Sequence, residues 1–356
     1  MGPTIALIDS KKLDKNFSYL TKNIKNNSKI IMIIKANAYG HGAIEVAKKF
    51  DKKIDYFGVA NLQEAIELKE AKIKKNILIL GSISNEEITD SIKKNIIFTI
   101  YDLSQLKFIN KLPFKRIKFH LKIDTGMNRL GVSINEIDKI LKIINMNTKL
   151  NMEGVYTHLA EADIKKSSFT KKQISLFHEI VIKIQKSVNR IDFIHIANSS
   201  GILNHNIDFC NTTRPGLMLY GLGTNKNLNP VMTLKTKIIK LRDLKPGESV
   251  SYGRTYIAKS KKKIAIVPIG YADGLPRSLS NKGYLFCKGN KCKILGRVCM
   301  DLTMIDVTNV LSPKIGDDVI IFGDKYQSAM DIGKSAKTIA YDIVCGISKR
   351  VTRLYK

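Results

Sequence analysis

The feature that most constrains this chain is a regular alternation between short β-branched runs and amphipathic stretches. Strand-like runs occupy residues 30–34, 56–60, 77–80, 96–100, 117–123, 153–157 and 192–197, with a weaker one near 207–212. Helical apolar spacing recurs between them, in segments such as 43–50, 62–72, 135–146 and 170–189. Alternating strands and helices predict a parallel sheet, and eight such units predict an α/β fold with an N-terminal (β/α)8 TIM-type barrel.

A second domain is expected after about residue 222. The segment GTNKNLNP is typical of a linker, and beyond it short strand-like pieces are interrupted by KPGE, PIG, ADG and KGN. We therefore expect the barrel domain over residues 1–222 and a C-terminal mainly-β domain over residues 223–356. The segment TIALID at 4–9 could also pair with the second domain, and the sequence leaves both placements open.

The chain is strongly basic, with 60 Lys and Arg against 31 Asp and Glu and a formal net charge of +29. Such a charge suits binding to the phosphates of a nucleic acid. The lysines, however, are spread over the whole chain, without a basic tail, an aromatic RNA-binding signature or a basic amphipathic stretch. We interpret them as a compositional bias of solvated surfaces and expect no nucleic-acid partner.

Other features concern the compartment in which the protein works. No apolar run approaches the ~18 residues that span a bilayer, and the N-terminus lacks the charged start and apolar core of a signal peptide. The cysteines are odd in number and scattered, at positions 210, 287, 292, 299 and 345. These features predict a cytoplasmic protein without a membrane partner. A metal site is not expected, because Cys287 and Cys292 have no His pair at ligand spacing.

Reactive side chains follow the predicted strands at the point where each strand ends, and barrel enzymes place their catalytic groups at that mouth. The first strand leads into Lys35 within IIMIIKANAYGHG, which predicts a partly desolvated amine suited to Schiff-base chemistry. Later strand ends carry HLKIDTGMNRLG, YTHLAEAD, HIANSSG and TTRPGLMLYG, and the loops after the last two strands of a barrel often bind phosphate. Each motif alone also suits turn chemistry or a core histidine. Their occurrence at successive strand ends predicts one active site.

A set of motifs then extends along nearly the whole chain: KANAYGHG, DTGMNRLG, HIANSSG, RPGLMLYG, VSYGRTY, IGYADG and GRVCMD. The set strongly resembles the alanine racemases. The resemblance implies a fold-type III enzyme that uses pyridoxal 5′-phosphate, with an N-terminal barrel, a C-terminal β domain, and a homodimer whose active sites draw on both subunits. It also implies interconversion of L-alanine and D-alanine by two bases, which supplies D-alanine for peptidoglycan synthesis in the cell wall.

Matched motif by motif, the resemblance implies roles for four catalytic residues. Lys35 is similar to the lysine that binds the cofactor and acts as the base for D-alanine. Tyr252, donated by the partner chain, is similar to the opposite base for L-alanine, and His158 to the histidine that contacts this tyrosine. Arg214 resembles the arginine that hydrogen-bonds the pyridine nitrogen. A guanidinium there keeps the nitrogen neutral and disfavours transamination.

The remaining matches concern binding. The residues implied to bind the cofactor are, besides Lys35 and Arg214, Tyr39, Ser199, Gly216, Leu217 and Tyr341. The substrate carboxylate is expected near Arg129, Met300 and Asp301. A narrow corridor to the site would be lined by Tyr271, Asp163, Arg277 and Arg297. Lys122 occupies a position that is carbamylated in many members of the family, and Asn128 replaces the small residue common before Arg129.

Two enzyme alternatives stay open at this point. A fold-type III amino-acid decarboxylase shares the barrel and the lysine, but Arg214 at the pyridine position and the tyrosine of SYG disfavour it. Racemisation of a related small amino acid such as serine also fits, because one methyl-sized group changes discrimination by only roughly 1–3 kcal/mol. A non-catalytic carrier built from one barrel is disfavoured because the chain continues beyond residue 230.

Overall fold

The computed structural model describes residues 2–25, 27–223, 225–323 and 325–356. The chain divides into two compact units. The barrel unit comprises Leu20–Ala38 and Ala43–Gly216, and the β unit comprises Met1–Tyr19, Tyr39–Gly42 and Leu217–Lys356. The chain passes between the two units within helix α1 (Ser10–Lys22), within the short turn α2 (Lys35–Tyr39), after Gly42 and after Gly216.

Eight parallel strands form a closed barrel, which confirms the fold predicted from the alternating pattern. In order along the chain they are β2 (Lys29–Ile33), β3 (Tyr56–Val59), β4 (Asn76–Ile79), β5 (Ile97–Ile100), β6 (Ile117–Lys122), β7 (Leu150–Tyr156), β8 (Phe193–Asn198) and β9 (Thr212–Arg214). The ring closes because β2 pairs in parallel with both β3 and β9, with Lys29 opposite Thr212. Each predicted run overlaps one of these strands, including the weak eighth run, which reaches Thr212.

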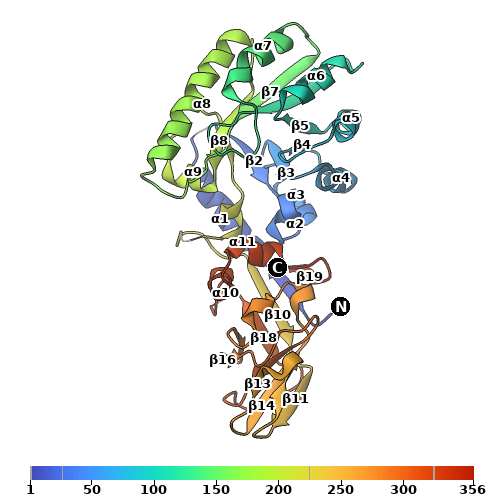
Figure 1. The fold of residues 1–356 in the computed structure, drawn as a ribbon, viewed down its shortest axis with the longest axis vertical. Helices are drawn as coiled ribbons and strands as arrows, with labels where there is room; N and C mark the ends of the chain where they lie inside the picture. The colour runs from blue at the N-terminus through green and yellow to red at the C-terminus, as the bar shows by residue number, and fades with distance from the viewer. Residues whose placement is uncertain (1, 26, 224, 324) are drawn as a thin grey trace. The chain divides into compact units, whose positions relative to one another are not determined.

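Helices lie on the outside of these strands, as Figure 1 shows for α4 to α8. They are α3 (Ala43–Phe50), α4 (Leu62–Glu70), α5 (Asn85–Lys93), α6 (Leu103–Lys111), the 3-10 turn η1 (Ile134–Glu136), α7 (Ile137–Asn145), α8 (Ser168–Ser187) and α9 (Ser199–Asn204). The predicted helical segments coincide with helices because their apolar residues face inward. In α7 the buried side chains are Ile137, Ile140, Leu141 and Ile144, which share one helical face.

The barrel interior is packed with side chains. Strands β3 and β5 are buried at every position, and the aromatic rings of Phe57, Phe98 and Phe119 are fully shielded from solvent. Space for the imidazole of His120 depends on Gly154, because a Cβ added at Gly154 would lie 2.5 Å from Nδ1 of His120. The sequence thus combines an apolar core with room for a buried polar ring.

The β unit is built on a six-stranded sheet in the order β16, β15, β18, β10, β1, β19. Its strands are β1 (Ile5–Ile8), β10 (Met232–Lys237), β15 (Tyr284–Cys287), β16 (Asn290–Lys293), β18 (Asp318–Phe322) and β19 (Thr352–Tyr355). Strand β1 pairs antiparallel with β10 and parallel with β19, so the N-terminal segment joins this sheet, a placement that the sequence left open. The observed units differ from the expected limits 1–222 and 223–356, because the N-terminal segment, Tyr39–Gly42 and residues 217–222 also belong to the β unit. At the N-terminus the reason is that the backbone hydrogen bonds of β1 are made in the β unit.

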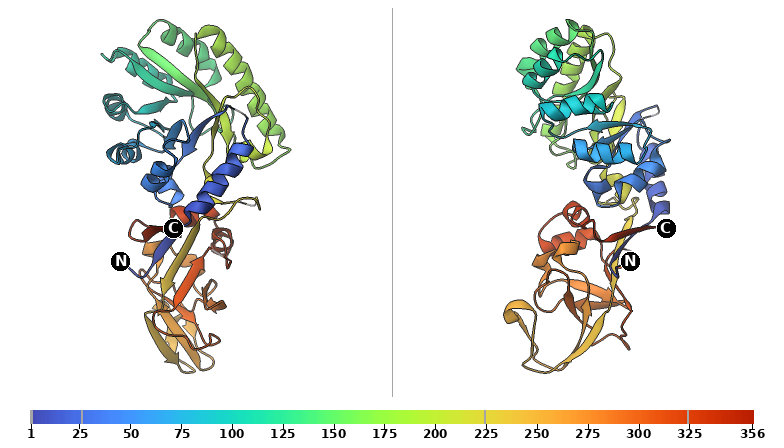
Figure 2. Two further views of the ribbon diagram at one scale, coloured as in Figure 1. Left: turned by 180° about the vertical axis from the view of Figure 1, so that it is seen from behind. Right: turned by 90° about the vertical axis from the view of Figure 1, so that its right-hand side faces the viewer.

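The remaining strands of the β unit form two smaller sheets. A three-stranded sheet contains β11 (Lys240–Leu244), β14 (Lys262–Val267) and β17 (Thr303–Asp306), and a hairpin contains β12 (Ser249–Val250) and β13 (Tyr256–Ile257). Helices α10 (Ala329–Ala336) and α11 (Ala340–Cys345) follow, with 3-10 turns η2 (Leu217–Tyr220), η3 (Tyr252–Arg254), η4 (Tyr271–Asp273) and η5 (Arg277–Leu279). Figure 2 shows these strands, mostly in yellow and orange, from two further sides. Over the described residues, no helix combines the length and the apolar character needed to cross a membrane.

Candidate active site

Lys35 lies two residues beyond the end of β2, at the carboxyl end of the first barrel strand. The four residues after it, Ala36 to Tyr39, have φ between 51° and 54°, a left-handed conformation that L-residues rarely adopt. The Lys35 side chain is exposed. This differs from the partial desolvation expected from the sequence, because the strand ends at Ile33 and the turn carries the amine past the buried apolar residues.

Glu64, on helix α4, anchors this left-handed turn. Its Oε1 accepts a hydrogen bond of 2.7 Å from the backbone N–H of Ala36, and its Oε2 accepts one of 2.7 Å from Ala60. Backbone N–H groups in irregular structure need such partners. The sequence analysis missed Glu64, because nothing in an amphipathic helix distinguishes one surface carboxylate from its neighbours.

Arg214 ends β9 and is almost completely buried. Its Nη2 donates to the carbonyls of Thr157 at 2.7 Å and Ile196 at 3.1 Å, and its Nη1 donates to Nδ1 of His195 at 2.6 Å. No carboxylate among the described residues forms an ion pair with it. Burial lowers the pKa of Arg214 to about 10, which leaves the guanidinium charged at neutral pH. A buried cation held by neutral acceptors is well suited to an anionic ligand.

The contact with Arg214 fixes the protons on two buried histidines. A guanidinium only donates, so Nδ1 of His195 accepts, and its Nε2 carries the proton and donates to Nδ1 of His120 at 2.9 Å. The Nε2 of His120 has no hydrogen-bond partner among the described residues. Burial and the charge of Arg214 lower the pKa of His195 well below 6.5 and that of His120 to about 3. Both rings are therefore neutral. Through the hydrogen bond from Arg214 to His195, they orient the guanidinium.

His158 contacts the other side of the same guanidinium. Its Nδ1 lies 3.2 Å from Nη2 of Arg214, and its carbonyl accepts a hydrogen bond of 3.1 Å from Gln173. The pKa of His158 is lowered well below 6.5, mainly by burial and to a smaller extent by the charges of Arg214 and Arg129. Its Nδ1 therefore accepts and its Nε2 carries a proton. Tyr252 belongs to the β unit, so the expected contact between it and His158 stays a prediction.

Lys122, the last residue of β6, is buried, whereas Arg129 is exposed. Burial lowers the pKa of Lys122 to about 8, with further lowering by the charges of Arg129 and Arg214. Asn128, which departs from the family pattern, has φ of 53°, a conformation that asparagine tolerates better than most residues. Carbamylation of Lys122 stays a prediction. A lowered pKa favours the neutral amine, the form that reacts with carbon dioxide.

The barrel unit thus gathers positive charge at the ends of its strands. The positive charges of Arg129, Arg214 and Lys35 lower the pKa of Lys122, and the carboxylate of Asp124 raises it. The guanidinium of Arg129 makes no hydrogen bond or ion pair with any residue that the structure describes. Cations in excess of carboxylates predict that the ligand of this site carries negative charge.

The expected phosphate-binding residues fall into two groups. In the barrel unit, the Oγ of Ser199 accepts a hydrogen bond of 3.0 Å from the backbone N–H of Gly216. Leu217 follows in the chain and is already part of the β unit. In the β unit, burial and then the nearby Cys345 and Tyr341 raise the pKa of Tyr39 above its ordinary value, so the phenol stays protonated and can donate. Whether the two groups act on one phosphate stays a prediction.

The β unit carries exposed aromatic and sulfur-containing side chains on three of the motifs. The exposed fractions are 71% for Tyr252, 52% for Met300 and 43% for Tyr271, high values for side chains of this kind. The backbone N–H of Tyr271 donates to the carbonyl of Cys299 at 3.0 Å, and that of Ala272 to Met300 at 3.1 Å. Gly270 allows this approach, because a Cβ there would lie 2.1 Å from the Met300 carbonyl oxygen.

Arg350 links two carboxylates of this region and was missed by the sequence analysis. It donates to Asp273 at 2.7 Å and to Asp301 at 2.8 Å. The scarcity of arginine in this lysine-rich chain was a signal that could have identified it, since the fork of an arginine bridges two carboxylates as a lysine cannot. Asp301 is therefore held at the surface by Arg350.

The expected corridor residues are distributed over both units. Tyr271, Arg277 and Arg297 belong to the β unit, and Asp163, which is exposed, belongs to the barrel unit. A Cβ added at Gly253 would lie 3.2 Å from the guanidinium carbon of Arg297, which places this arginine beside the turn of Tyr252. The side chain of Arg277 makes no hydrogen bond or ion pair within the described ranges. The corridor assignment stays a prediction.

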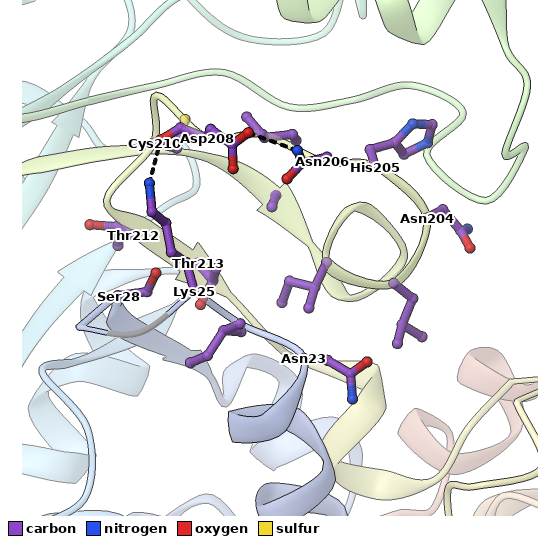
Figure 3. A pocket seen from close by; sticks show the side chains of 15 residues that line it. Asn23, Lys25, Ser28, Asn204, His205, Asn206, Asp208, Cys210, Thr212 and Thr213 are labelled. Atoms are coloured by element: carbon purple, nitrogen blue, oxygen red, sulfur yellow. Dashed lines mark hydrogen bonds between the residues drawn. The ribbon is translucent and has the colours of Figure 1, made fainter.

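A cavity of about 360 Å³ lies elsewhere in the barrel unit. Figure 3 shows its lining, where Asp208 accepts hydrogen bonds from Lys25 and Asn206. None of the predicted site residues lines this cavity, so it is separate from the candidate active site. In the part of the chain that the structure describes, no group of His, Cys, Asp and Glu side chains could hold a metal ion.

A lysine at the end of the first strand, a buried arginine at the end of the last strand and a separate β unit define a (β/α)8-barrel enzyme. The family profiles "Alanine racemase, N-terminal domain" and "Alanine racemase, C-terminal domain" match residues 8–224 and 231–355. The alanine racemase of Halothermothrix orenii is 40% identical over 367 residues, which cover 99% of this chain and 97% of that protein. The chain belongs to the alanine racemase family.

Solved structures agree with this assignment. The alanine racemase of Clostridium difficile has a TM-score of 0.94 and 36% identity, covering 100% of this chain and 96% of that one. The alanine racemase of Bacillus anthracis with bound L-Ala-P has a TM-score of 0.93 and 31% identity, covering 100% and 95%.

Proposed function

We propose that this protein racemises alanine in the cytoplasm with pyridoxal 5′-phosphate as cofactor, and so supplies D-alanine for peptidoglycan synthesis. The observation that carries the proposal is that Lys35, at the end of the first barrel strand, belongs to the same group of positive charges as Arg129 and Arg214, since all three lower the pKa of Lys122. Lys35 provides the amine that binds the aldehyde of the cofactor. Membership of the alanine racemase family supports alanine rather than serine as substrate.

The side chains of the barrel unit fit this cofactor. Arg214 is buried and charged, and no carboxylate of the described residues pairs with it, so it can donate to a pyridine nitrogen that stays unprotonated. The Oγ of Ser199 accepts the N–H of Gly216 at 3.0 Å, an orientation in which the hydroxyl proton of Ser199 can be donated to a phosphate. When bound, pyridoxal phosphate withdraws electrons from the substrate Cα and makes its proton labile.

Inversion at Cα needs two groups that carry protons on opposite sides of the carbon. We assign Lys35 to the side of D-alanine and Tyr252 of a second subunit to the side of L-alanine. His158 is neutral with Nδ1 turned to Arg214, so its Nε2–H is available to donate to the oxygen of that phenol and to stabilise it when the proton leaves.

The second subunit is an essential part of this proposal. The 71% exposure of Tyr252 and the 52% exposure of Met300 suit residues that become covered when two copies associate. In a head-to-tail pair, each β unit would contribute Tyr252, Met300 and Asp301 to the barrel of the other subunit, and Arg129 would bind the substrate carboxylate.

The first test measures cofactor binding and racemisation separately. Purified wild-type protein should show the visible absorption of bound pyridoxal phosphate and should convert L-alanine to D-alanine in a coupled assay. Lys35→Ala should lose both, whereas Lys171→Ala, at an exposed site on α8, should keep both. A colourless wild-type protein after incubation with the cofactor would refute the proposal at its first step.

The second test concerns the shared site. Lys35→Ala and Tyr252→Phe should each be inactive, and mixing them under conditions that exchange subunits should restore activity. Restoration follows because a mixed dimer contains one site with both residues intact. If the mixture stays inactive while mixed dimers are seen by native mass spectrometry, the two residues act within one chain.

A further inference from the structure

Tyr252 lies in a short turn that has little secondary structure to hold it. Residues 251–255 connect β12 and β13, which pair through Ser249 with Ile257 and Val250 with Tyr256. Beyond these pairs, Ala258 exchanges backbone hydrogen bonds with Glu248 and Gly247. A short hairpin of this kind is marginally stable by itself. The direction of the exposed Tyr252 side chain must therefore be set by contacts outside the hairpin.

The backbone of this turn is strained at the residue before Tyr252. Ser251 has φ of 67° and ψ of −177°, a combination that is almost restricted to glycine. Gly253 and Arg254 follow with φ of 69° and 46°. A serine keeps such a conformation only when surrounding contacts enforce it, and such residues cluster at functional sites.

The contacts that enforce it come from residues 296–299. The Oγ of Ser251 donates to the carbonyl of Arg297 at 2.7 Å, and the thiol of Cys299 lies 3.3 Å from the same hydroxyl. Gly296 leaves room for this approach, because a Cβ there would lie 2.8 Å from Cβ of Ser251 and 2.5 Å from the Val250 carbonyl oxygen. Any larger residue at position 296 would push the turn away.

The far end of the turn is tied to the same segment by Asn281. Its Nδ2 donates to the hydroxyl of Thr255 at 3.1 Å, and its Oδ1 accepts from the backbone N–H of Gly296 at 2.7 Å. Both ends of the turn that carries Tyr252 are therefore hydrogen-bonded, directly or through one side chain, to residues 296–297.

Residues 296–299 also lead directly into Met300 and Asp301, and the N–H of Tyr271 bonds to the carbonyl of Cys299. The hydroxyl of Ser251 thus connects the turn of the proposed base to the segment proposed to border the substrate carboxylate. Displacement of either segment would change the distance between the phenol and the carbon that loses its proton.

We infer that Ser251 is a positioning residue for racemisation: its hydroxyl holds the strained turn on Arg297 and so sets the direction of the Tyr252 phenol. The inference rests on the proposed function, in which Tyr252 transfers the proton on the side of L-alanine. Misplacement of a reacting group by ~1 Å can lower a rate ~100-fold. Loss of the Ser251 hydroxyl should therefore slow the proton transfer by Tyr252 and leave the proton transfer by Lys35 unchanged.

The test uses the cofactor-loaded full-length protein in deuterated buffer with D-alanine. Lys35 acts on this enantiomer, so exchange of its Cα proton with retention of configuration reports on Lys35, while appearance of L-alanine reports on Tyr252. We expect Ser251→Ala and Ser251→Gly to lower inversion roughly 10- to 100-fold and to leave exchange within about threefold of wild type. Ser328→Ala removes a hydroxyl that caps α10 in the same unit and should leave the ratio of the two rates unchanged.

Melting temperatures of the unloaded variants separate strain from anchoring. Glycine accepts φ of 67° without strain, so Ser251→Gly should melt higher than Ser251→Ala, although both lose the hydroxyl. Inversion that is normal in Ser251→Gly and low in Ser251→Ala would show that the backbone conformation alone matters and would overturn the inference.

Two further outcomes are decisive. If both Ser251 variants invert D-alanine like wild type while Tyr252→Phe does not, the inference is wrong and the proposed function stands. If Tyr252→Phe itself inverts D-alanine normally, Tyr252 is not the base on the side of L-alanine, and the inference falls with that assignment. The proposed function fails only if wild type forms no L-alanine. A parallel loss of exchange and inversion in the Ser251 variants would indicate general damage to the site and would also overturn the inference.

Discussion

Replacing Glu64 by glutamine should loosen the turn that follows Lys35. The carboxylate accepts the N–H groups of Ala36 and Ala60, each at 2.7 Å, and glutamine can accept only one of them while its amide group faces the other donor. A hydrogen bond to a charged group contributes about 1.5–3 kcal/mol, so we expect a loss of about 2 kcal/mol, or roughly 30-fold in the local opening equilibrium. The left-handed residues Ala36 to Tyr39 add an intrinsic tendency to open.

Amide hydrogen exchange followed by mass spectrometry measures this opening directly. Peptides that contain Ala36 and Ala60 should exchange roughly 30-fold faster in Glu64→Gln than in wild type, while peptides from β6 and β7 stay unchanged. Glu70→Gln, an exposed glutamate on the same helix, serves as the matched control. Equal exchange at Ala36 and Ala60 in wild type and Glu64→Gln would refute the idea that this carboxylate anchors the turn.

Two predictions follow from buried ionisable groups. Lys122 loses its proton at a pKa of about 8 in the folded chain but at 10.5 when unfolded, so the unfolded state binds more protons between these values. In buffer free of carbon dioxide, the free energy of unfolding should rise by on the order of 2–3 kcal/mol over that range. If denaturant titrations show that the free energy of unfolding of Lys122→Met rises equally with pH, the change belongs to another group. The depressed pKa values of His120 and His195 predict neutral rings with the proton on Nε2 at pH values between about 6 and 8. Nitrogen-15 NMR of histidine-labelled protein should show the Nε2-protonated tautomer for both rings. An imidazolium signal from either ring would contradict the hydrogen bonds that link His120, His195 and Arg214.

The sequence by itself determined the architecture of this protein. Hydrophobic periodicity is a local property, so the alternation of strand and helix patterns predicted a closed barrel, and the strand-end positions of Lys35, Lys122 and Arg214 followed from it. The motifs also identified the family, which the comparisons confirm. These results need only residue types and their spacing along the chain.

Only the tertiary structure decided how the site residues are held. The bond from Glu64 to Ala36 spans 28 positions and that from Arg350 to Asp273 spans 77, so no local pattern contains either pair. The pairing of β1 with β10 and β19 likewise joins the two ends of the chain. The pKa shifts of His158, His195 and Lys122 arise mainly from burial, a property that exists only after strands distant in sequence have closed around these side chains.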